Sequence, residues 1–101
     1  MTPTTANALR AMMLDVVNEG TGFNAQIDGV EVAGKTGTAQ TGVEGQAPHA
    51  WFIAFAPANA PKYAVAVIVE NGGDFGSEAT GGEVAAPVAK AVLQNLLANG
   101  P

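Results

Sequence analysis

The sequence contains no cysteine, a single serine, a single histidine and four basic residues among 101. Without cysteine there is no disulfide framework and no thiolate to act as nucleophile or metal ligand. Four basic against nine acidic residues leave a net charge of −5, which argues against nucleic acid as a partner, because phosphate recognition needs clustered Lys and Arg. His49 has no metal-ligating neighbours in the sequence, so we expect no metal site, and nothing in the sequence implies an organic cofactor.

Charge of either sign is also scarce. Charged residues make up 13% of the chain and hydrophobic residues 48%, whereas about 25% charged is usual for a soluble domain. The longest apolar run, residues 50–58, is far too short to span a membrane. The first ten residues lack the pattern of a signal peptide. We therefore expect one small domain that belongs to a larger body.

The hydrophobic periodicity predicts an α+β fold: a helix, a three-stranded antiparallel meander and a second helix. The expected elements are a helix at 5–19, strands at about 30–39, 50–56 and 63–70, and a helix at 83–99. Thr4 or Thr5 is the expected N-cap of the first helix, and Gly20 its stop. The apolar stripe expected on the second helix comprises Val84, Val88, Val92, Leu93, Leu96 and Leu97.

The second and third strands have no polar face, so both faces of the sheet need a cover. Two short helices suffice for one face, which leaves the other as an association surface. The expected core includes the aromatic residues Trp51, Phe52, Phe55 and Tyr63.

The stretch GVEVAGKTGTAQ, residues 29–40, satisfies the phosphate-loop formula and also contains the triplet K-T-G. A phosphate loop needs a flexible loop that leads into a helix at the Lys-Thr pair. Here the wildcard positions 30–33 read as a strand, Glu31 would repel phosphate, and the glycines and threonines after Thr36 disfavour a helix. The nucleotide-binding interpretation is therefore rejected.

A strand through the triplet places Thr36 and Thr38 on one side and Lys35 on the other. Two hydroxyls and a nearby ammonium suit a carboxylate. Gly34 and Gly37 would leave room for a substrate backbone. A plain edge strand with a solvated lysine explains the same residues equally well.

Five segments in order resemble the class B penicillin-binding protein transpeptidases: MMLDVVNEGTG, VAGKTGTAQ, HAWFIAFAP, YAVAVIVENGG and AAPVAKAVLQNLL. The resemblance covers essentially the whole chain. It implies the C-terminal portion of the β-lactamase/transpeptidase-like fold, a sheet flanked by helices. It also implies roles: Lys35 as the triplet lysine, Thr36 and Thr38 as carboxylate-binding hydroxyls beside Gly37, and the Thr38 backbone N–H as half of an oxyanion hole.

The family's S-x-x-K nucleophile and S-x-N motif are absent, because the one serine, Ser77, is followed by Ala79 and Thr80 at the decisive positions. The resemblance, with these two motifs missing, implies a fragment that is expected to be inactive alone. Its parent would be a penicillin-binding serine D,D-transpeptidase that cross-links peptidoglycan stem peptides ending in D-Ala-D-Ala. The resemblance implies three further things: β-lactams as ligands, the rest of the transpeptidase domain as a partner, and a membrane-anchored location on the extracytoplasmic or periplasmic face.

Two alternatives remain open at this point. The parent can be a β-lactamase or a penicillin-sensing domain, since the residues that separate hydrolase from transferase are not in this chain. The chain can also be an independent binding or dimerisation module that uses its open sheet.

Overall fold

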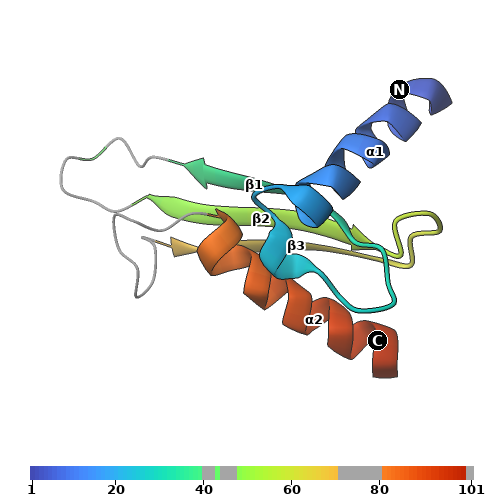
Figure 1. Cartoon of the computed structure of the whole chain (residues 1–101). Helices are drawn as coiled ribbons and strands as arrows, with labels where there is room; N and C mark the ends of the chain where they lie inside the picture. The colour runs from blue at the N-terminus through green and yellow to red at the C-terminus, as the bar shows by residue number, and fades with distance from the viewer. Residues whose placement is uncertain (40–42, 44–47, 71–80, 100–101) are drawn as a thin grey trace.

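Two helices lie on opposite faces of a three-stranded antiparallel sheet (Figure 1). The computed structural model describes residues 1–39, 43, 48–70 and 81–99. Its elements are α1 (Pro3–Glu19), η1 (Phe23–Ala25), β1 (Ala33–Ala39), β2 (His49–Ala56), β3 (Tyr63–Val69), η3 (Gly81–Ala85, a π-turn) and α2 (Ala86–Asn99). The strands follow the order β1-β2-β3, which confirms the predicted α+β meander.

Helix α1 begins two residues before the expected start. Thr2, not Thr4 or Thr5, is its N-cap: the Thr5 amide donates to the Thr2 hydroxyl at 3.2 Å. Pro3 occupies the first turn, where its missing N–H costs nothing. Gly20 ends the helix as predicted, with its amide donating to the Val16 carbonyl at 3.1 Å.

Strand β1 begins at Ala33 rather than near residue 30. Val30 instead pairs with Ile27 across a tight turn, in which Gly29 has a φ of +80° that a side chain would strain. The Glu31 carbonyl accepts the Ala58 amide at 2.8 Å, outside the strand ladder. Val30 and Glu31 thus have backbone partners outside the sheet ladder, so β1 is shorter than its β-branched residues had predicted.

The core lies between the sheet and α2. Its largest fully buried side chains are Phe52, Leu93, Val17 and Val32. Helix α2 approaches the sheet through buried Ala86, Ala89 and Leu93, and the preceding Ala85 is buried too. The predicted stripe was therefore wrong for Val88 and Val92, which are exposed. Alanines at the contact let the helix lie close to the sheet, and the larger valines turn outward.

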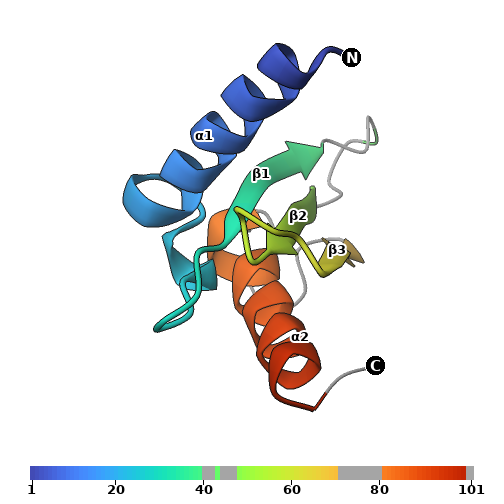
Figure 2. The ribbon, with the colours of Figure 1, turned by 90° about the vertical axis from the view of Figure 1, so that its right-hand side faces the viewer.

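The second face of the sheet is only partly covered. In Figure 2, α1 packs beside β1 and rises away from β2 and β3 toward its N-terminus. The helices thus divide between the two faces instead of sharing one. We call this side of β2 and β3 the open face; Phe55 there is half-buried, and the exposed residues are Trp51, Ile53, Ala64, Ala66 and Ile68. Trp51, expected in the core, is 39% exposed, Ile53 46% and Ile68 42%.

Two residues named above, Gln40 at the end of the stretch 29–40 and Ser77, lie outside the described residues. Within the described ranges, neither helix has the length and apolar character needed to cross a membrane.

Candidate functional site

The K-T-G triplet lies in the middle of β1. Lys35, Thr36 and Gly37 pair with Ile53, Phe52 and Trp51 of β2. Among the described strands β1 pairs only with β2, so β1 is an edge strand of the sheet. Its outer edge therefore presents backbone N–H and C=O groups that no described strand takes up.

Side chains of the triplet alternate between the two faces, as predicted. Thr36 and Thr38 pair with Phe52 and Ala50, whose side chains point into the core, whereas Lys35 lies on the face of Ile53 and Trp51. The exposed Lys35 ammonium donates to the Thr36 carbonyl at 2.7 Å. The ammonium is thereby held against the strand backbone at Thr36.

The Thr36 hydroxyl has a partner that the sequence did not indicate. The hydroxyls of Thr21 and Thr36 form a hydrogen bond of 2.8 Å, across 15 residues of sequence. The sequence had assigned a role only to the neighbouring Gly20, as the stop of the first helix. A hydroxyl between two helix-breaking glycines gives no signal of a partner, because the contact arises only once α1 packs beside β1.

Asn24 and Gly82 lie next to this hydroxyl pair. The Asn24 side-chain amide donates to the Gly82 carbonyl at 2.9 Å. Gly82 is buried, and a Cβ there would collide with the Thr21 carbonyl oxygen and approach the Thr36 Cγ2 atom to 3.7 Å. The segment after α1, the middle of β1 and the start of η3 therefore meet at Thr36.

The two glycines beside Lys35 differ in their surroundings. A Cβ at Gly34 would lie 2.5 Å from Phe52 Cζ and 2.9 Å from the Ile53 carbonyl oxygen. Gly34 therefore makes room for the protein's own core, not for a substrate as expected. A Cβ at Gly37 would meet only the Trp51 Cβ, at an ordinary 3.5 Å. Gly37 is the position with free space beside it.

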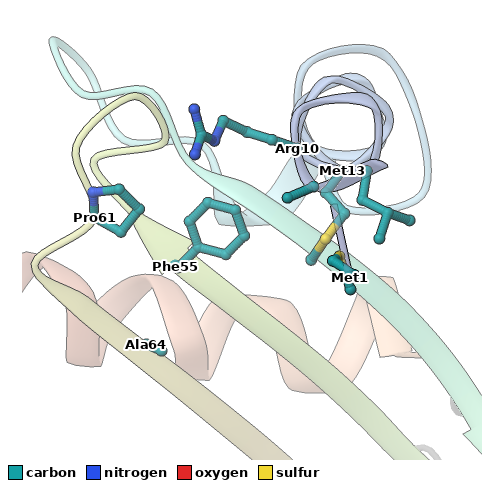
Figure 3. Close-up of a pocket in the computed structure, with 8 residues that line it drawn as sticks. Met1, Arg10, Met13, Phe55, Pro61 and Ala64 are labelled. Atoms are coloured by element: carbon teal, nitrogen blue, oxygen red, sulfur yellow. The ribbon is translucent and has the colours of Figure 1, made fainter. Parts of the chain in front are cut away.

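An apolar groove runs between α1 and the open face. One pocket of about 350 Å³ is lined by Lys35, Ile53 and the α1 residues Leu9, Met12, Met13 and Val16. A neighbouring pocket of about 390 Å³ is lined by Met1, Ala6, Leu9, Arg10, Met13, Phe55, Pro61 and Ala64. Figure 3 shows Met13 and Arg10 on the helix side of this pocket and Phe55 on the sheet side. The Lys35 side chain thus borders an apolar space on the open face.

His49 is the first residue of β2 and pairs with Ala39 at the end of β1. The described residues contain no cluster of three or more His, Cys, Asp or Glu side chains suited to hold a metal ion.

Residues 35–37 of β1 carry the K-T-G triplet that occurs in penicillin-binding proteins and class A β-lactamases. Residues 1–94 match the family model of the penicillin binding protein transpeptidase domain. The chain belongs to this family, as its sequence blocks had indicated.

Named relatives agree with this assignment. The chain is 57% identical over 77 residues to the peptidoglycan D,D-transpeptidase PbpA of Mycobacterium tuberculosis, which covers 74% of the chain and 16% of that protein. It is 40% identical over 97 residues to the stage V sporulation protein D of Bacillus subtilis, covering 92% of the chain and 15% of that protein. The chain therefore spans about one sixth of the length of these relatives.

A solved structure shows the same fold. Penicillin-binding protein A of M. tuberculosis, as its ceftriaxone acyl-enzyme complex, superimposes with a TM-score of 0.84 at 47% identity, over 93% of this chain and 21% of that chain. Further structures of that protein are acyl-enzyme complexes with imipenem and penicillin G.

Proposed function

We propose that this chain is the K-T-G-bearing part of a serine D,D-transpeptidase that cross-links peptidoglycan stem peptides and is acylated by β-lactams. The observation that carries the proposal is the edge strand β1, on which the Thr36 and Thr38 side chains share one face and the Lys35 ammonium lies 2.7 Å from the Thr36 carbonyl. Membership of the family and the acyl-enzyme complexes of the mycobacterial relative support the same chemistry.

This geometry supports recognition of a carboxylate. The hydroxyls of Thr36 and Thr38 donate to the carboxylate of the peptide or β-lactam, and the Lys35 ammonium supplies positive potential. Hydrogen bonds in which the donor or the acceptor is charged are roughly twice as strong as neutral ones. Gly37 lies between the two threonines and has free space at its Cβ position. A substrate backbone can therefore lie close to the strand.

Stabilisation of the oxyanion is assigned to the backbone of Thr38. The Thr36 carbonyl accepts a hydrogen bond from the Lys35 ammonium. This bond supports an orientation of the carbonyl toward the outer edge of β1. In a strand, the N–H and C=O of one residue point to the same side, and residues two apart share that side. The Thr38 N–H then faces the same edge and donates to the negative charge that develops on the attacked carbonyl oxygen.

The nucleophile belongs to the parent protein. An upstream serine attacks the D-Ala-D-Ala carbonyl, terminal D-Ala leaves, and the acyl group passes to the amine of a second stem peptide. A β-lactam acylates the same serine, and its opened ring remains attached. Since the nucleophile and its activating base act as a unit, this chain alone turns over nothing. We place the parent on the extracytoplasmic face of the cell membrane, held there by an anchor outside this chain.

Acylation of the parent tests the proposal. Intact-mass spectrometry of the full-length protein after incubation with penicillin G is expected to show one adduct per molecule, on a serine upstream of residue 1, and none on residues 1–101. A folded parent that gains no adduct contradicts the proposed function. The lifetime of the adduct separates transferase from β-lactamase, because a hydrolase releases it quickly; the names of the relatives favour the transferase.

A second prediction concerns the isolated 101-residue chain. Exposed Trp51, Ile53 and Ile68 on the open face are expected to make it self-associate. Sedimentation velocity should show oligomers that Ile53→Glu shifts toward the monomer. Val88→Glu on α2 is the matched control, because Val88 is as exposed as Ile53, at 46% each. Equal effects of the two substitutions would mean that association does not use the open face.

A further inference from the structure

A chain of contacts links Asn24 to the Thr36 hydroxyl. Asn24 lies in η1, and its amide group donates to the Gly82 carbonyl at 2.9 Å in a part-buried hydrogen bond across 58 residues of sequence. This bond holds the start of η3 against the segment that follows α1. Neither Asn24 nor Gly82 belongs to the K-T-G strand.

Gly82 transmits this constraint by close packing. It has no space for a side chain, because a Cβ would collide with the Thr21 carbonyl oxygen, which is backbone and moves only with the whole segment. Gly82 therefore limits where the Thr21 backbone can lie. Thr21 in turn forms the 2.8 Å hydroxyl pair with Thr36.

We propose that Asn24 and Gly82 are positioning residues that fix the Thr21–Thr36 hydroxyl pair in the orientation that receives a carboxylate. This inference rests on the proposed function. A threonine hydroxyl rotates to suit its partners, so its direction depends on where the partner oxygen is held. Small misplacements in a binding constellation have large effects on rate. The Asn24–Gly82 hydrogen bond keeps the partner oxygen in place.

The test compares two ligands that differ only in the carboxylate. Full-length protein is acylated with penicillin G and with penicillin G methyl ester, and the ratio of the two acylation rate constants measures carboxylate recognition. Asn24→Ala and Asn24→Asp remove the donor, and Gly82→Ala introduces the colliding Cβ. We expect the ratio to fall roughly tenfold in the Asn24 variants and further in Gly82→Ala, since misplacement by about 1 Å can cost about 100-fold.

The control is Asn95→Ala, an asparagine on the exposed surface of α2, which should leave the ratio unchanged. Thermal unfolding of each variant verifies that it is folded, and if Gly82→Ala does not fold, the two Asn24 variants decide. An unchanged ratio in the Asn24 variants, or equal losses for acid and ester, overturns the positioning role. Absence of any adduct in the wild-type protein instead refutes the proposed function.

Discussion

Lys35→Ala in the full-length protein is expected to lower the rate constant of acylation by penicillin G by about 100-fold to 1,000-fold, the cost of removing one electrostatic stabiliser from an acyl-transfer site. The Lys35 ammonium lies 2.7 Å from the Thr36 carbonyl on the edge strand. In the proposed mechanism it supplies positive potential at the carboxylate and at the nucleophile. Time-resolved intact-mass spectrometry measures the loss directly.

The matched control is Lys62→Ala. Lys62 is exposed, directly precedes β3, and donates its backbone amide to the Ala56 carbonyl, a bond that the substitution preserves. Its acylation rate should equal that of the wild-type protein. Equal rates for Lys35→Ala and wild type would support the competing interpretation, in which β1 is a plain edge strand with a solvated lysine.

Gly34→Ala is expected to destabilise the protein by about 1–3 kcal/mol, the usual cost of forcing extra atoms into a packed core. The added Cβ would lie 2.5 Å from Phe52 Cζ and 2.9 Å from the Ile53 carbonyl oxygen. Phe52 is fully buried at 0% exposure, so a movement of its ring disturbs the packed core. Urea unfolding of the full-length protein, followed by a probe in this domain, measures the change.

Gly37→Ala, three residues along the same strand, is the control for the effect of glycine itself. Its Cβ would meet only the Trp51 Cβ at 3.5 Å, so the expected change in the free energy of unfolding is within about 0.5 kcal/mol. Similar losses for the two variants would show that backbone freedom, not the Phe52 ring, sets the requirement at Gly34.

Much of the architecture follows from local patterns. The helix stop at Gly20, the meander and the opposite orientation of Lys35 and Thr36 were all predicted, because helical spacing and strand alternation are properties of short segments. Recognition of the family also needed only the sequence, since VAGKTGTAQ and HAWFIAFAP lie in order along the chain.

The predictions of burial were wrong where packing against a distant element determines which side chains are buried. Val88 and Val92 were expected to face the core, yet the helix packs through its alanines, because the distance between helix and sheet sets which side chains fit. Trp51 has the hydrophobicity of a core residue, but its exposure depends on which face α1 covers.

The sequence by itself determined the elements, the family and the strand on which Lys35, Thr36 and Thr38 lie, because periodicity and motif are read within a few neighbouring residues. Only the tertiary structure decided what surrounds them. The Thr21–Thr36 hydroxyl pair, the Asn24–Gly82 hydrogen bond and the closeness of Gly34 to Phe52 join different elements of the chain. Such contacts exist only after the helices and the sheet have packed, so no local pattern specifies them.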